Sequence, residues 1–152
     1  MRINHYTKSF IGILFFITIV PNNEPVKTTG LNLTIVVKDL RNSIGTVLFA
    51  LYDREDAFPD QDYKKYLRKL TGKITDGSST VTFENLPKGR YAVNILHDEN
   101  NDGKIKKGII LPQEGIGFSN YQSIGFSNKP SFAKASFNLL GDMKIEVHII
   151  YL

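Results

Sequence analysis

The recurrence of an apolar residue at every second position is the feature that most constrains how this chain can fold. Two runs, Leu31–Val37 and Ile145–Tyr151, follow this pattern from end to end. Because neighbouring side chains of a β-strand point to opposite faces of the sheet, the pattern predicts strands with a buried face. In a third run, 46–52, one face carries Val47, Phe49 and Leu51 and the other carries Thr46, Leu48, Ala50 and Tyr52.

Strand-like runs recur about seven times, which is the number of strands in an immunoglobulin-like β-sandwich. We therefore expect an all-β fold, a Greek-key β-sandwich, that fills residues 31–152 as a single domain. The first two strands are expected to form a hairpin through Leu40–Ile44. Later strands are expected at 80–83, at 90–96 and from Phe132 through Phe137.

Two connections between these strands carry local signals of their own. In the first, the apolar residues 63, 66, 67 and 70 have the spacing of a helix, with Asp60 or Asp62 as its cap. We expect one short helix or an irregular crossover near 60–71. In the second, Leu86–Gly89 forms a turn before Tyr91, whose hydroxyl is expected to bond back to the backbone at a corner of the sandwich.

The first 20 residues differ in character from the rest of the chain. Arg2 and Lys8 precede an apolar run of 11 residues, 10–20, and a polar breaker follows. This order is typical of a secretory signal peptide, and the run is shorter than the roughly 20 residues that span a bilayer. We predict a signal peptide, or an uncleaved anchor, at 1–20, a linker at 21–30 and a periplasmic or secreted location. Membrane contact is expected only through an uncleaved N-terminal segment.

Composition excludes several classes of function. The chain has no cysteine, which excludes disulfides, thiol catalysis, lipidation at a cysteine and thiolate metal sites. Its formal charge of +4 includes Arg2 and Lys8, without which 17 basic and 15 acidic residues remain. That balance gives no concentrated basic face for nucleic acid. The densest basic cluster, Lys64–Lys69, is expected to be a solvated helix face.

One segment, directly after the predicted strand 90–96, has the pattern of a metal-binding loop. Asp98, Asn100 and Asp102 alternate, and Gly103 follows them. A calcium loop places its first ligands and its sharp turn in this order, and the backbone carbonyl of Lys104 would supply the next ligand.

The second half of a calcium loop is missing. Lys106 occupies the ninth position, and Ile109 occupies the twelfth in place of a bidentate glutamate. Glu114 is the residue that we assign to complete the shell. Two interpretations stay open: a calcium-stabilised loop, or a connecting turn whose Asn and Asp side chains bond to the backbone. No other cofactor is predicted.

Residues suited to hydrolytic catalysis are few. Outside the predicted signal peptide only His97 and His148 remain, and there is no nucleophile elbow. By strand alternation His97 leans toward the side of Tyr91, whereas His148 faces solvent. His97 with Asp98 or Glu114 is the candidate site of an alternative hydrolase. Our leading expectation is that the protein is not an enzyme and has no catalytic residue.

A short duplication, Ile116–Asn120 and Ile124–Asn128, lies in the least regular part of the chain, residues 104–130. Its period of eight residues is too short for a solenoid, which needs about 20 or more. We expect two similar turns that tuck Phe118 and Phe126 into the core. The alternative is a paired loop that lines a shallow aromatic cleft.

Four motifs follow one another along the second half of the chain. They are Leu86-Pro-x-Gly-x-Tyr91-Ala-Val, His97-Asp-Glu-Asn100 with Asp102-Gly103-Lys104, Pro112-x-Glu-Gly115-x-Gly-Phe-Ser-Asn120, and Pro130-Ser-Phe-x-x-Ala135-x-Phe137. Their order resembles a bacterial secreted family catalogued as domain of unknown function 2141, over roughly residues 31–152. The resemblance implies an exported β-sandwich similar to prealbumin-like or carboxypeptidase-regulatory-like modules, with no catalytic residues to transfer. Lys106 and Lys107 depart from the acidic or amide residues common in that family.

The sequence therefore favours an exported, non-catalytic β-sandwich module. We expect loops 98–130 to bind a protein, a glycan or an envelope component, because binding surfaces usually lie on loops held by a rigid scaffold. The alternatives are a hydrolase that uses His97 with a nearby carboxylate and a calcium-stabilised structural domain.

Overall fold

The structure, a computed structural model, describes residues 30–105 and 113–152. The predicted signal peptide at 1–20, the linker up to residue 29 and the loop positions Lys106, Lys107 and Ile109 lie outside the described residues. Within the described residues, no helix is long and apolar enough to cross a membrane.

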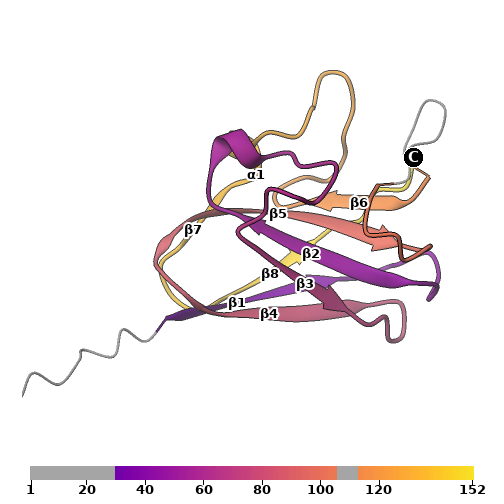
Figure 1. Ribbon diagram of the computed structural model, residues 1–152, viewed down its shortest axis with the longest axis horizontal. Helices are drawn as coiled ribbons and strands as arrows, with labels where there is room; N and C mark the ends of the chain where they lie inside the picture. The colour runs from indigo at the N-terminus through magenta and orange to yellow at the C-terminus, as the bar shows by residue number, and fades with distance from the viewer. Residues whose placement is uncertain (1–29, 106–112) are drawn as a thin grey trace, which may run out of the picture.

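Two β-sheets pack face to face in the described part of the chain (Figure 1). The strands are β1 (Leu31–Val37), β2 (Thr46–Tyr52), β3 (Arg68–Gly72), β4 (Ser79–Leu86), β5 (Gly89–Asp98), β6 (Gly115–Phe118), β7 (Phe137–Leu139) and β8 (Met143–Val147). One sheet has the order β4-β1-β8, and the other has the order β3-β2-β5-β6 with β7 paired to β5. The predicted all-β sandwich is confirmed.

The connection between the first two strands crosses from one sheet to the other. β1 pairs with β4 in an antiparallel ladder and with β8 in a parallel one, and β2 belongs to the second sheet. The predicted hairpin through Leu40–Ile44 is therefore wrong. Leu40 is buried, and its backbone N–H donates to the carbonyl oxygen of Gly77 at 3.0 Å, which directs the chain toward the β3–β4 turn.

The segment near 60–71 is an irregular crossover that runs into a strand, and the helix considered for it is not present. A single 3-10 turn, η1 (Glu55–Ala57), comes earlier, and β3 begins at Arg68. The Asp60 carboxylate accepts the backbone N–H groups of Lys64 at 2.7 Å and Lys65 at 2.6 Å, and Tyr63 has a φ of 50°. These bonds close a tight turn, which competes with helical hydrogen bonds for the same N–H groups.

The C-terminal elements differ from the predicted ones at two places. Residues Phe132–Ala135 form a short helix, α1, instead of beginning a strand, because the Ser131 side chain accepts the N–H of Lys134 at the helix start and the apolar residues of this turn face the protein interior. The final strand ends at Val147, after which Ile150 pairs with Ile116 of β6. β6 itself lies in a region where we expected no strand.

The sandwich interior forms the first of two hydrophobic cores. It is built from the inward faces of both sheets. Because side chains alternate between the two faces of a strand, every second residue of each strand enters this core. Its buried residues are Leu33, Ile35, Val37, Leu40, Val47, Phe49, Leu51, Phe83, Leu86, Tyr91, Val93, Ile95, Leu139, Val147 and Ile149.

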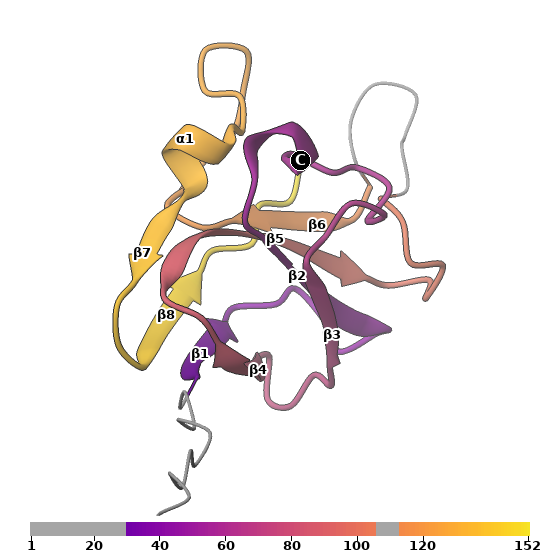
Figure 2. The same ribbon diagram turned by 60° about the vertical axis from the view of Figure 1, so that its left-hand side comes forward.

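A second core covers the opposite face of the β3-β2-β5-β6 sheet. The crossover 53–67 and the segment 119–136 lie over this face (Figure 2). Its buried residues are Leu48, Ala50, Tyr52, Ala57, Phe58, Tyr63, Ala92, Leu96, Ile116, Phe118, Tyr121, Phe132 and Ala135. The predicted division of the 46–52 side chains between two faces is confirmed, and both faces are buried.

Two finer predictions about strand ends are also confirmed. The Tyr91 hydroxyl donates to the Pro87 carbonyl oxygen at 2.9 Å, which is the expected bond back to the backbone at the corner. His148 is exposed, as the alternation in the last run predicts.

Candidate functional site

The loop that follows β5 is held by its own side chains. Asp98 is buried, and its two carboxylate oxygens accept the backbone N–H groups of Asp102 at 3.1 Å and Gly103 at 2.9 Å. The Asn100 side-chain oxygen also accepts the Asp102 N–H at 2.9 Å, and an Asp102 carboxylate oxygen accepts the Lys104 N–H at 2.9 Å. These bonds satisfy the backbone of a tight turn, which is the second of the two interpretations left open by the sequence.

The acidic residues of the predicted calcium shell, Asp98, Asp102 and Glu114, do not form one cluster in the structure. Among residues 30–105 and 113–152, no three His, Asp or Glu side chains gather in a way that could hold a metal ion. Glu114 is buried, and its carboxylate adds to the effect of Glu99 in raising the pKa of Arg41. Each carboxylate of the loop keeps further lone pairs. Calcium binding therefore stays a prediction of the sequence.

His97 lies inside the sandwich and is fully buried. Its side chain is 0% exposed, with Nδ1 2.8 Å from the Tyr151 hydroxyl and Nε2 3.0 Å from the carbonyl oxygen of Ile44. Because a carbonyl oxygen only accepts, we assign the proton of the neutral ring to Nε2, and Nδ1 then accepts from Tyr151. The predicted inward lean of His97 is confirmed, and both ring nitrogens are occupied by structural bonds.

A set of polar contacts, which we call the staple, joins four segments beside this histidine: Arg41–Asn42, Glu99, Gln113 and Tyr151. Arg41 donates from Nε to Glu99 Oε1 at 2.8 Å and from Nη2 to both Glu99 Oε2 and the Gln113 carbonyl oxygen, the latter at 2.9 Å. Asn42 donates to Glu99 Oε1 at 2.6 Å. The Arg41 guanidinium also lies 4.7 Å from the centre of the Tyr151 ring. Sequence reasoning missed this staple because its members are single residues far apart in the chain.

The first copy of the duplication is buried against β5. Phe118 packs into the second core, and the Ser119 hydroxyl accepts the Val93 N–H at 2.9 Å and donates to the Ala135 carbonyl oxygen at 2.7 Å. The Asn120 amide donates to carbonyl oxygens of Lys134, Ala135 and Ser136 at the end of α1. This copy therefore fixes the segment 119–136 onto the sheet.

The second copy forms a projecting turn, and the prediction that it buries Phe126 is wrong. Phe126 is 100% exposed at the tip of a turn closed by two backbone hydrogen bonds between Gly125 and Asn128. The Asn128 amide donates to the Ser123 carbonyl oxygen at 2.7 Å. The copies differ because Phe118 lies in β6, which pairs with β5, whereas the turn around Phe126 pairs only with itself, through Gly125 and Asn128.

We call residues 122–130 the aromatic turn, and Figure 2 shows it projecting beyond α1. Its base is closed by Tyr121, whose hydroxyl accepts the Ser131 N–H at 3.1 Å and donates to the Lys129 carbonyl oxygen at 3.0 Å. The alternative of a shared aromatic cleft is not supported, because one phenylalanine ring of the duplication is buried and the other is fully exposed.

The staple makes a specific prediction about stability and pH. The hydrogen bonds from Arg41, followed by that from Asn42, lower the pKa of Glu99 from 4.5 to about 2. Because the folded pKa is below the unfolded one, the stabilisation is complete above about pH 4.5 and is lost as the pH falls toward 2. Glu99→Gln should therefore lower the free energy of unfolding by about 1–2 kcal/mol at pH 7, after allowance for solvent screening. Urea unfolding at about pH 7, 5 and 3.5 checks this.

A difference between wild type and Glu99→Gln that stays constant from pH 7 to the acid end of that series would contradict the assignment. Glu146→Gln is the matched control, because Glu146 forms an exposed ion pair with Lys38. That substitution should change the free energy of unfolding by less than about 1 kcal/mol.

Calcium dependence can be measured directly on the folded protein. Because the Asp98 loop is closed by its own hydrogen bonds, we expect the same melting temperature in millimolar calcium and in chelator. Binding to the native state alone would instead add about 2.7 kcal/mol at a hundredfold excess over the dissociation constant. A stabilisation of that size, removed by Asp98→Asn, would restore the calcium-loop interpretation.

Comparison with known proteins places the chain in a family. No curated protein matches it. A fimbrial assembly protein from Parabacteroides distasonis is similar over 80% of this chain and 53% of its own length, with 12% identity and a TM-score of 0.43. This chain thus spans about half the length of that protein. The family described as "uncharacterized protein conserved in bacteria (DUF2141)" matches residues 35–148, which include the Asp98 loop and the aromatic turn. The chain belongs to this family, as the order of its motifs predicts.

Proposed function

We propose that this protein is an exported, non-catalytic β-sandwich module that binds a partner of the cell envelope or the exterior through loops 98–130. The observation that carries the proposal is the full exposure of Phe126 at the tip of a hydrogen-bonded turn. A phenylalanine gains about 1.5–3 kcal/mol when it is buried, so an exposed ring on a supported turn is suited to anchor a partner.

The support beneath the aromatic turn adds to this argument. The turn rises from the segment 119–136, which is bonded to β5 and packs over the sheet as part of the second core. Side chains held by rigid elements lose less conformational freedom on binding than those of loose loops. The ring is therefore presented by the fold at low entropic cost.

Charge around the turn narrows the chemistry of the partner. No Asp or Glu occurs between Gly115 and Gly141, and this stretch contains Lys129 and Lys134. Both lysines are exposed. A partner that offers an apolar pocket with a neutral or acidic rim fits this surface, because like charges at the rim would oppose binding.

Replacement of Phe126 tests the proposal. We expect wild-type protein to bind at least one of three purified preparations: outer-membrane fragments, peptidoglycan or an immobilised glycan panel. Phe126→Ser should weaken that binding by about tenfold or more, which corresponds to about 1.4 kcal/mol. It should leave the melting temperature unchanged, because the ring is fully exposed.

Leu140→Ser is the matched control, because Leu140 is 69% exposed and lies between β7 and β8, away from the aromatic turn. This variant should bind as the wild type does. Equal binding by Phe126→Ser and wild type, or equal loss in both variants, would contradict a role for the aromatic turn.

A further inference from the structure

The two sides of the sandwich are closed in different ways. On one side the chain leaves β8 and reaches the other sheet, where Ile150 and Ile116 exchange backbone hydrogen bonds of 3.0 and 2.8 Å. On the other side β4 and β3 are, within the part of the chain that the structure describes, the outermost strands of their sheets, and they form no ladder with each other. Figures 1 and 2 show this second side away from the aromatic turn.

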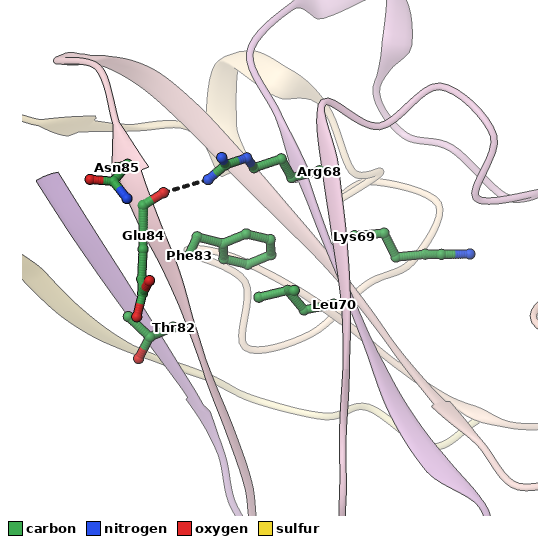
Figure 3. Close-up of a pocket in the computed structure, with 7 residues that line it drawn as sticks. All are labelled: Arg68, Lys69, Leu70, Thr82, Phe83, Glu84 and Asn85. Atoms are coloured by element: carbon green, nitrogen blue, oxygen red, sulfur yellow. Dashed lines mark hydrogen bonds between the residues drawn. The ribbon is translucent and has the colours of Figure 1, made fainter. Parts of the chain in front are cut away.

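A cavity of about 380 Å³ lies between β3 and β4. Figure 3 shows Phe83 and Leu70 facing each other within it, and Arg68 reaching across to the Glu84 carbonyl oxygen. The volume is in the range of ligand-binding pockets. The residues that line the cavity are Arg68, Lys69, Leu70, Thr82, Phe83, Glu84 and Asn85.

Three hydrogen bonds fix the direction of the backbone groups along β4. The Asn32 N–H donates to Asp142 at 2.8 Å, so even-numbered residues of β1 turn their backbone toward β8 and odd-numbered ones toward β4. The hydroxyls of Thr34 and Thr82 lie 2.9 Å apart, as expected where an antiparallel pair has no mutual backbone bonds. The backbone groups of Thr82 therefore point away from β1.

The third hydrogen bond shows that Glu84, two residues after Thr82, also turns its carbonyl group away from β1. Arg68 donates to the Glu84 carbonyl oxygen from the β3 side, so this carbonyl also points away from β1. Residues two apart in a strand turn their backbone groups the same way. Thr82 and Glu84 thus present a short row of N–H and C=O groups at an exposed edge. β4 contains neither proline nor lysine, which often protect such edges, and its register irregularity lies at Glu84–Asn85, beyond Thr82.

We propose that this edge of β4, with the cavity beside it, is a strand-addition site for an extended, acidic segment of a partner polypeptide. Alternating N–H and C=O groups are matched by another β-strand. An apolar side chain of the added segment would pack on Leu70, which is only partly buried at the mouth of the cavity. Arg68 would leave the Glu84 carbonyl and pair with a carboxylate of the segment.

A defined peptide tests this site without knowledge of the natural partner. The probe is a capped heptapeptide of alternating Glu and Val, and the comparison peptide replaces each Glu by Lys. On addition of the acidic peptide to isotope-labelled protein, the amides of Thr82 and Glu84 should shift and exchange more slowly with solvent. The acidic peptide should bind about tenfold more tightly than the basic one, and Arg68→Ala should abolish that preference.

Substitutions at Thr82 separate backbone pairing from side-chain contact. Thr82→Pro removes an N–H that the β1 ladder does not use, so it should weaken peptide binding by about tenfold, whereas Thr82→Ala should bind like the wild type. Phe126→Ser should also bind like the wild type, which separates this site from the proposed function of the aromatic turn.

Two results would overturn the proposal: unchanged Thr82 and Glu84 amides at saturating peptide, or equal binding of the acidic and basic peptides. If Thr82→Pro unfolds, the exchange rates of the wild-type amides decide alone. Slower exchange on peptide addition supports strand addition, and unchanged exchange excludes it.

Discussion

Burial of the β3-β2-β5-β6 sheet on both faces is the constraint on which the rest of this structure depends. An antiparallel sheet commonly leaves one face to water, but here Leu48, Ala50 and Leu96 make the outward face as apolar as the inward one. That face needs a cover, and the crossover 53–67 and the segment 119–136 provide it. The polar groups beneath are paired, as when Tyr63 and the Asp60 carbonyl satisfy the Asn94 side chain.

The cover formed by segment 119–136 determines where the aromatic turn lies on the surface. Segment 119–136 is fixed to β5 through Ser119, and the aromatic turn with Phe126 rises from it. In residues 30–105 and 113–152, no segment covers the outer face of the other sheet, β4-β1-β8, and this face carries an ion pair between Lys38 and Glu146. The exposed edge of β4 therefore lies in the sheet that is covered on one face only. At this edge Arg68 of β3 donates to the Glu84 carbonyl oxygen of β4 and so connects the two sheets.

Local patterns in the sequence predicted what depends on neighbours in the chain. The two faces of 46–52, the Tyr91 corner and the orientation of His97 follow from alternation and turn chemistry. The pairing of strands that are distant in the chain could not be predicted from these patterns, because nothing near Leu40–Ile44 indicates that β1 pairs with β8. Phe118 and Phe126 occupy identical pentapeptides. Phe118 is buried because its segment pairs with β5, and Phe126, whose segment has no such partner strand, is exposed. The apolar residues on both faces of 46–52 were a usable signal of double burial.

Native-state hydrogen exchange tests the central claim that segment 119–136 is a packed cover and not a loose loop. The amides to follow are those of Ser119, which donates to Val93, and Ala135, which donates to Ser131. The core reference is the amide of Ala50 in the β2–β5 ladder, because the Val93 N–H itself donates to the Ser119 hydroxyl. A packed cover predicts that Ser119 and Ala135 exchange through the same cooperative opening as Ala50, with comparable protection. Exchange of both amides at the rate of an unstructured peptide, with Ala50 still protected, would contradict the account.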